Sequence, residues 1–229
     1  MFIKICGIRD VETARWVAAL SPDAIGLNFY VPSPRCVTPD VAAEICRTVS
    51  ATIEKVGVFV NHPAADVVSS ANNCGLTAVQ LHGDETPLDL ATVKTALPTI
   101  KLIRAFRINV ETDHTAAESW QTIARDLDEC RTLGVNLFAC LIDAFVPGTY
   151  GGTGRTIFEA GLTDTYDRYN WPPMILAGGL TPENIATAIA NVRPWGVDVA
   201  SGVESSPGVK DRAKVEQFIA TARSAGSPV

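Results

Sequence analysis

Short apolar runs recur along the chain, and each is bounded by glycine, proline or polar residues. Runs of roughly four to eight apolar residues with such flanks are typical of buried β-strands. The pattern predicts eight strands, over residues 2–6, 24–29, 55–60, 78–81, 100–105, 137–142, 174–177 and 196–199.

Helical spacing of apolar residues appears between these runs. Residues 10–20 place apolar side chains three and four positions apart, and the stretches 39–49 and 63–74 begin with proline, which the first turn of a helix tolerates. Residues 182–184 open a further helix in the same way. Strands and helices therefore alternate along the chain.

This alternation favours parallel strands joined by right-handed helical crossovers. Eight such units in 229 residues predict a single (β/α)8 barrel of the TIM type over residues 1–229, with a short flexible tail from about residue 224. The alternative is an open doubly wound sheet, which usually carries a glycine-rich turn after its first strand. Here that turn is only residues 6–9, Cys-Gly-Ile-Arg, so the barrel fits better.

Composition and charge narrow the class of ligand. A net charge of −6 argues against a nucleic-acid partner, because binding to a phosphate backbone depends on clustered lysine and arginine. No apolar stretch approaches the roughly 20 residues that cross a bilayer, and no export signal opens the chain, so we expect a cytoplasmic protein without a membrane partner. The six cysteines lack C-x-x-C spacing and are expected as thiols.

The active site of such a barrel lies at the carboxyl ends of its strands. Cys6 ends the first strand, and if its side chain points into the barrel, Lys4 does so too. A buried ammonium needs a carboxylate, and Asp198 on the eighth strand has the matching position. We therefore predict a Lys4–Asp198 ion pair, which either holds the barrel closed or tunes the pKa of a neighbouring group.

Two residues suit acid–base chemistry. Cys6 can act as a base only where nearby positive charge or amide dipoles favour its thiolate; otherwise it is a packing residue, as we expect for the other five cysteines. Asp143 closes an apolar run, and desolvation there would suit its carboxyl group to proton donation. The alternative for Asp143 is a helix-capping or turn residue before the segment 147–148.

Glycines follow three of the predicted strands, at residues 151–154, 178–179 and 202. They free backbone N–H groups for a phosphate, which barrels commonly hold in the loops after strands seven and eight. Residues 148–156 superficially resemble a nucleotide-binding P-loop, but the spacing is one residue too long and arginine stands in place of lysine.

Two further residues are weaker candidates. Arg35 follows Ser33-Pro34 and could grip a carboxylate with two hydrogen bonds, although an arginine in this position is more often a solvated surface residue. His82 lacks a second histidine or an acidic residue at metal-ligand spacing, so we expect no metal.

Taken together, these segments resemble the phosphoribosylanthranilate isomerases of tryptophan biosynthesis over nearly the whole chain. The matching segments are residues 4–7 (KICG), 26–30 and 33–35 (GLNFY, SPR), 56–61 (VGVFVN), 79–85 (VQLHGDE), 142–144 (IDA), 151–154 (GGTG), 176–184 (LAGGLTPEN), 196–199 (GVDV), 201–204 (SGVE) and 207–211 (PGVKD).

The resemblance implies an Amadori rearrangement of N-(5-phosphoribosyl)anthranilate to 1-(2-carboxyphenylamino)-1-deoxyribulose 5-phosphate, with no cofactor. Cys6 would be the base and Asp143 the acid. Substrate binding would fall to Arg35, for the anthranilate carboxylate, to His82 and Asp84 at the mouth, and to the phosphate-binding loops, whose candidate residues are Gly152, Gly178, Gly179, Ser201 and Gly202.

This chain departs from the family pattern at three places. Ala200 replaces a frequent serine, Asn28 interrupts a usually apolar strand, and residues 155–159 lack the common Phe-Asp-Trp. Two other functions remain open: a different phosphate-handling barrel enzyme, which would need another acid–base set and typically a metal, and a phosphosugar-binding protein without activity, which would need neither Cys6 nor Asp143.

Overall fold

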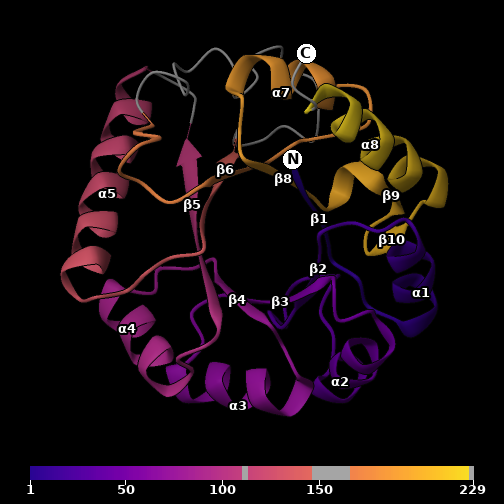
Figure 1. Ribbon diagram of the computed structural model, residues 1–229, viewed down its shortest axis with the longest axis horizontal. Helices are drawn as coiled ribbons and strands as arrows, with labels where there is room; N and C mark the ends of the chain where they lie inside the picture. The colour runs from indigo at the N-terminus through magenta and orange to yellow at the C-terminus, as the bar shows by residue number, and fades with distance from the viewer. Residues whose placement is uncertain (110–112, 146–165, 227–229) are drawn as a thin grey trace.

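A closed barrel of eight parallel strands forms the centre of the computed structural model, and helices surround it (Figure 1). The structure describes residues 1–109, 113–145 and 166–226, without the side chains of residues 109, 113–116, 144 and 145. The strands are β1 (Phe2–Cys6), β2 (Ala24–Asn28), β3 (Glu54–Phe59), β4 (Ala78–Leu81), β5 (Lys101–Asn109), β6 (Ala139–Phe145), β7 (Met174–Ala177) and β8 (Gly196–Val199). β1 pairs with both β2 and β8, so the predicted barrel is confirmed.

Helices follow most of the strands and pack on the outside of the barrel (Figure 1). They are α1 (Val11–Ala19), α2 (Pro39–Thr48), α3 (Ala64–Cys74), α4 (Pro87–Ala96), α5 (Asp113–Thr132), α7 (Ile185–Val192) and α8 (Arg212–Ala225). After β8 the chain also forms a short 3₁₀ turn, η2 (Ser201–Val203), and the antiparallel pair β9 (Glu204–Ser206) and β10 (Val209–Lys210).

Local sequence signals explain where several helices begin. The side chains of Asp10, Thr38 and Thr86 each accept a hydrogen bond from a backbone N–H in the first turn of α1, α2 and α4. Such caps satisfy N–H groups that have no partner within the helix. Pro39 and Pro87 occupy the first turn of their helices, where a missing N–H costs nothing.

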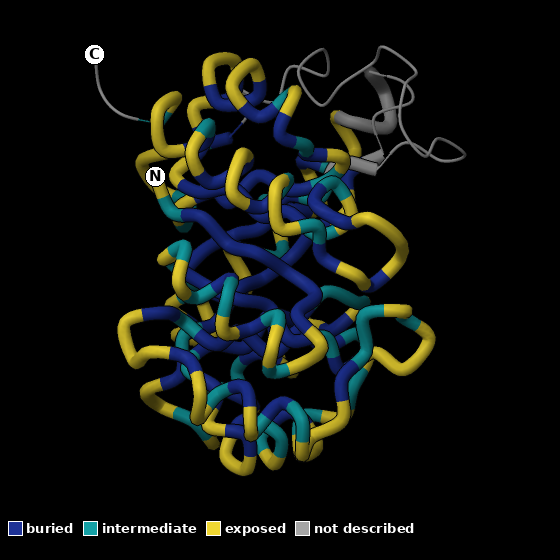
Figure 2. The backbone as a smooth tube through the Cα atoms, turned by 90° about the vertical axis from the view of Figure 1, so that its right-hand side faces the viewer, coloured by how far each residue is buried: buried dark blue, intermediate teal, exposed yellow. Residues whose placement is uncertain are grey.

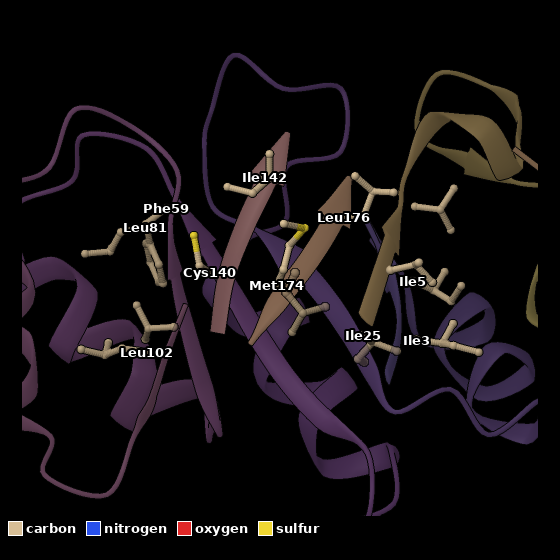
Figure 3. Close-up of a cluster of buried hydrophobic side chains, with 14 of the residues drawn as sticks. Ile3, Ile5, Ile25, Phe59, Leu81, Leu102, Cys140, Ile142, Met174 and Leu176 are labelled. Atoms are coloured by element: carbon tan, nitrogen blue, oxygen red, sulfur yellow. The ribbon is translucent and has the colours of Figure 1, made fainter. Parts of the chain in front are cut away.

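The alternation of the strands divides the core into two layers. Side chains that point outward pack against the helices, among them Ile3, Ile5, Ile25, Phe59, Leu81, Leu102, Cys140, Ile142, Met174 and Leu176 (Figure 3). Smaller residues, including Ala24, Ala78 and Ala139, fill the barrel interior instead. Figure 2 shows the resulting burial, with the strands dark blue and the exposed positions on the outer helices and loops.

Strands β5 and β6 differ from their predicted bounds. The sequence predicts an end at residue 105, but β5 continues to Asn109, where it pairs with the end of β6. The sequence does not predict this extension, because Arg107 and Asn109 are polar and polar residues after an apolar run are typical of a loop. β6 begins at Ala139 rather than residue 137 and continues past Asp143.

Two helix ends also differ from the sequence expectation. Residues 182–184 precede α7, which begins at Ile185 with Asn184 as its cap residue. At the other end of the chain, α8 continues to Ala225 and so extends into the stretch predicted as a flexible tail from residue 224.

Candidate active site

A cavity of about 260 Å³ opens at the carboxyl ends of the strands. Eight of the ten site residues predicted from the sequence line it: Cys6, Arg35, His82, Asp143, Gly178, Gly179, Ser201 and Gly202. Asp84 lies in a neighbouring cavity of about 370 Å³ instead, and His82 lines both. Gly152, like the P-loop-like stretch 148–156, lies outside the described residues.

Cys6 ends β1 with its thiol directed into the barrel, as the alternation predicts. The room for this thiol comes from Gly26 on β2, the register partner of Cys6. A Cβ atom at Gly26 would lie only 2.6 Å from the Cys6 sulfur. Gly26 is not among the site residues predicted from the sequence, because only the pairing of β1 with β2 brings it next to Cys6.

The predicted Lys4–Asp198 pair is confirmed, with Lys4 Nζ 2.9 Å from Asp198 Oδ1 across the seam between β1 and β8. Lys4 is fully buried. Burial is the largest single effect and disfavours the ammonium form of Lys4, but the charges and hydrogen bonds of Asp198 and Cys6 together outweigh it, so the pKa of Lys4 is raised.

Burial raises the pKa of the Cys6 thiol above its ordinary value of 9.0, although Lys4 and Lys210 place opposing positive charge nearby. Lys4 and Lys210 are the positive charges that a thiolate at Cys6 requires. The net direction is nevertheless upward, because desolvation of the thiolate is the larger effect. Cys6 is therefore a neutral thiol in the ligand-free protein near pH 7.

Asp143 lies within strand β6, where it is the register partner of Arg107 on β5 and Ala177 on β7. The alternative assignment, a cap or turn before residues 147–148, concerns a segment that lies outside the described residues. Its Oδ2 atom lies 3.3 Å from His82 Nε2, and its side chain is 29% exposed. The carboxyl group thus reaches the cavity while an imidazole supports it from one side.

Arg35 already holds a carboxylate with two hydrogen bonds, and that carboxylate belongs to the protein. Its Nε and one terminal nitrogen lie 2.7 and 2.8 Å from the two oxygens of Glu204. Lys210 Nζ donates to the same Glu204 at 2.9 Å and to the carbonyl of Ala200 at 2.8 Å. The Arg35 guanidinium is therefore fixed at the cavity wall before any ligand arrives.

This cluster also sets the charge of Glu204. Burial alone would raise the pKa of Glu204, but the hydrogen bonds from Arg35 and Lys210 lower it below its ordinary value of 4.5. For Lys210, burial lowers the pKa despite the ion pair. Glu204 and Lys210 are not among the site residues predicted from the sequence, because their buried side chains meet Arg35 only through the β9–β10 hairpin, whose polar sequence gives no strand pattern.

The loops after β7 and β8 pack against each other at the cavity. A Cβ atom at Gly202 would lie 1.8 Å from the carbonyl oxygen of Leu180, so no larger residue fits. Gly178 and Gly179 both have positive φ. The two predicted phosphate-binding loops thus form one continuous wall of backbone.

Two departures from the family pattern have local explanations. Asn28 Oδ1 accepts a hydrogen bond of 2.8 Å from Tyr30 N, and its amide reaches Ser33 Oγ at 3.4 Å. Asn28 therefore organises the loop that carries Arg35. Ala200 contributes its carbonyl to Lys210, an interaction that needs no side chain.

Nothing in the described part of the chain suggests a metal or a membrane span. No group of three or more histidine, cysteine or acidic side chains there could hold a metal ion. Nor is any described helix both long enough and apolar enough to cross a membrane.

Comparison with known proteins decides the family. The model of the N-(5′-phosphoribosyl)anthranilate isomerase family matches residues 3–221. This chain belongs to that family. An N-(5′-phosphoribosyl)anthranilate isomerase of Gloeothece citriformis is 39% identical over 218 residues, which cover 95% of this chain and 92% of the relative.

Solved structures of phosphoribosylanthranilate isomerases agree with this assignment. The enzyme from Thermotoga maritima superposes with a TM-score of 0.78 at 31% identity, over 97% of this chain and 98% of the other. A second isomerase structure, with a TM-score of 0.75, 31% identity and coverage of 97% and 98%, holds reduced 1-(o-carboxyphenylamino)-1-deoxyribulose 5-phosphate.

Proposed function

We propose that this chain converts N-(5′-phosphoribosyl)anthranilate into 1-(2-carboxyphenylamino)-1-deoxyribulose 5-phosphate, with Asp143 as the acid and Cys6 as the base. One observation carries the proposal: Cys6 and Asp143 line the same cavity, and the glycine-containing loops after β7 and β8 line it too. Family membership supports the reaction, and the cavity supports the residue roles.

In the first step Asp143 donates a proton to the ribose ring oxygen. The bond between C1′ and this oxygen breaks, and the anthranilate nitrogen supplies an electron pair to C1′. The product is an open-chain iminium cation. A positioned carboxylic acid typically contributes about 10²- to 10⁴-fold to such a step.

In the second step the Cys6 thiolate removes the proton from C2′. The electron pair of the C–H bond forms the C1′–C2′ double bond, and the iminium nitrogen takes back its pair. The resulting enol becomes a ketone when C1′ gains a proton and the C2′ hydroxyl loses one. The chemistry needs no cofactor, because the iminium nitrogen accepts the electrons.

The neutral Cys6 thiol of the ligand-free protein is compatible with this order of events. The iminium cation forms beside the thiol, and a nearby positive charge favours the thiolate. Lys4 adds a permanent positive charge from below. Asp143, which is a carboxylate once it has given up its proton, lies on the same cavity wall and accepts the proton of the Cys6 thiol before the second step.

The substrate has two anionic ends, and the cavity has two places for them. We assign the phosphate to the loops that carry Gly178, Gly179, Ser201 and Gly202, with Gly152 as a further candidate. Backbone N–H groups in such loops bind phosphate without lysine or arginine. The anthranilate carboxylate falls to Arg35.

His82 and Asp84 have less direct roles in this proposal. His82 contacts Asp143 at the cavity, so we assign it to positioning. Asp84 Oδ2 accepts a hydrogen bond of 3.1 Å from Asn61 Nδ2. Asp84 lines the neighbouring cavity of about 370 Å³ and not the cavity that holds Cys6 and Asp143. Asp84 would therefore meet the substrate at the rim.

The proposal also includes the setting of the reaction. We place it in the cytoplasm, with the small phosphosugar-anthranilate as the partner rather than nucleic acid or a membrane. The net charge of −6 supports this choice, since it disfavours contact with polyanions.

The test is a turnover assay with purified protein and phosphoribosylanthranilate generated in situ. We expect the fluorescence of the substrate to disappear and the aminoketose to be identified by mass spectrometry and NMR. A protein that binds the substrate without converting it would contradict the proposal and support the phosphosugar-binding alternative.

A further inference from the structure

Gln80 is a buried polar residue that the proposed mechanism does not use. It lies on β4 with its side chain 1% exposed, and it lines the cavity beside Cys6 and Asp143. Ala78 points into the barrel interior, so Gln80 and then His82 follow on the same face of the strand. A buried amide costs free energy where its polar atoms lack hydrogen-bond partners, and Gln80 Oε1 has none within the described residues.

Gln80, His82 and Asp143 form a connected row. Gln80 Nε2 lies 3.1 Å from His82 Nδ1, and His82 Nε2 lies 3.3 Å from Asp143 Oδ2. The second contact is not aligned as a hydrogen bond, since His82 Nε2 has no such partner within the described residues. Catalytic hydrogen bonds are often long in ligand-free enzymes and tighten when substrate binds.

The direction of the hydrogen bond between Gln80 and His82 decides which imidazole nitrogen carries the proton. A neutral imidazole has one N–H donor and one acceptor nitrogen. If Gln80 donates to Nδ1, that nitrogen must be the acceptor, and the proton must lie on Nε2. The N–H group then faces Asp143.

We propose that Gln80 is a positioning residue that holds His82 in its Nε2–H tautomer, so that His82 orients the acidic proton of Asp143 toward the substrate. This inference rests on the proposed acid role of Asp143. With Oδ2 facing the His82 N–H, the proton of the carboxylic acid belongs on Oδ1. When that proton leaves, negative charge grows on the carboxylate, and the contact with His82 strengthens. An interaction that strengthens in this way accelerates the reaction rather than only binding the substrate.

The tautomer can be measured directly in the ligand-free protein. Two-dimensional ¹H–¹⁵N spectra of the imidazoles report it, and the chain has only 3 histidines. We expect the Nε2–H form for His82 in the parent. Gln80→Glu presents an acceptor to Nδ1 and should move the proton there, whereas Gln80→Met removes the preference. An Nδ1–H form in the parent, or an unchanged tautomer in both variants, would overturn the proposal.

Kinetics provide the functional readout. Gln80→Met should lower kcat by about ten- to a hundredfold while KM changes far less, because the hydrogen bond that orients His82 toward Asp143 is lost. Gln217→Met, on the exposed face of α8, is the matched control and should leave both the tautomer and kcat unchanged. An altered tautomer with unchanged kcat would contradict the positioning role.

The two proposals fail differently in these experiments. If the parent does not turn over the substrate, the proposed function fails, while the spectra still report the tautomer of His82. If the parent is active and the tautomer of His82 is unchanged in both variants, only the role of Gln80 fails. Circular dichroism of each variant checks that the barrel is folded.

Discussion

At the scale of single residues, the main finding is how charge surrounds Cys6. The thiol lies above the Lys4–Asp198 pair and near Lys210, yet burial raises its pKa. Buried thiols are usually inert packing residues, and positive charge is what makes them reactive. The surroundings of Cys6 combine both influences, which fits a base that is activated only when a cationic intermediate forms.

Alkylation of Cys6 tests this description. We expect the rate of its modification by iodoacetamide, followed on the Cys6 peptide by mass spectrometry, to rise with pH and reach half-maximum above pH 9.0, the ordinary value for the pKa. Lys4→Met removes a positive charge that lowers the pKa of Cys6, so the midpoint should move further up. A midpoint below pH 9.0 in the parent would contradict the description.

Glu204 gives a second prediction at this scale. Since the pKa of Glu204 is lowered on folding, its contribution to stability is present above its ordinary pKa of 4.5 and is lost as the pH falls through the folded value. Glu204→Gln should lower the free energy of unfolding by about 3 kcal/mol at pH 7, because Arg35 and Lys210 both lose the carboxylate that neutralises them. Urea unfolding of both proteins should show this difference narrowing below pH 4.5; a difference independent of pH would contradict the argument.

Sequence reasoning was most successful for residues whose position follows from strand alternation. Lys4, Cys6 and Asp198 were placed correctly because a strand places every second side chain on one face. It failed for Gly26 and Glu204, whose importance depends on the neighbour that the fold brings to them. Arg35 shows the same limit: the sequence predicts a carboxylate partner, and the fold supplies Glu204.

At the scale of elements, the two loops after β7 and β8 act together. Gly202 in η2 approaches the Leu180 carbonyl so closely that the loops share one backbone wall. The sequence indicates two separate glycine loops, and their contact arises only from the pairing of β7 with β8. Strand bounds were least predictable where polar residues continue a strand, as in β5.

Gly202→Ala tests the contact between these loops. The added methyl group must push the loops apart, which costs about 1–3 kcal/mol in comparable overpacked sites. If this loss falls on phosphate binding, KM should rise about tenfold for each 1.4 kcal/mol. Ser206→Ala, on the exposed part of β9, is the control. An unchanged KM in Gly202→Ala would contradict the assignment of phosphate binding to these loops.

At the scale of the whole molecule, the Lys4–Asp198 pair closes the barrel. The two residues are register partners on β1 and β8, the first and last strands. The ion pair therefore links the first and last strands of the barrel, and Lys4 also lowers the pKa of Cys6 against the effect of burial. Both roles considered for the pair thus have support in the structure.

Lys4→Met tests the structural role. Removal of one partner leaves the buried Asp198 carboxylate uncompensated, so we expect a loss of about 3–5 kcal/mol in the free energy of unfolding. Lys4→Met with Asp198→Asn should recover part of it. Because folding raises the pKa of Lys4 above 10.5, its contribution should persist up to that pH and decline only beyond it. Urea unfolding measures both effects, and equal stability of Lys4→Met and the parent would contradict them.

The chain as a whole is acidic, whereas positively charged side chains lie at the site. With a net charge of −6, the protein has no general attraction for an anionic substrate. In the proposed function, anion recognition is instead concentrated at one cavity, on the loop backbone and on Arg35, which Glu204 holds in place. The closed barrel was predictable from strand count and chain length, whereas this local concentration required the positions of Glu204 and Lys210.

The most direct test of the central claim is the steady-state turnover of phosphoribosylanthranilate by Cys6→Ser, Asp143→Asn and the double variant. We predict that each single change lowers kcat by about 10²-fold or more, because each step needs its own proton transfer. The two losses should not be additive, since the slower of the two steps limits kcat in the double variant. Folding should be unchanged by circular dichroism. Activity close to that of the parent in either single variant would contradict the assignment of Cys6 and Asp143 as base and acid.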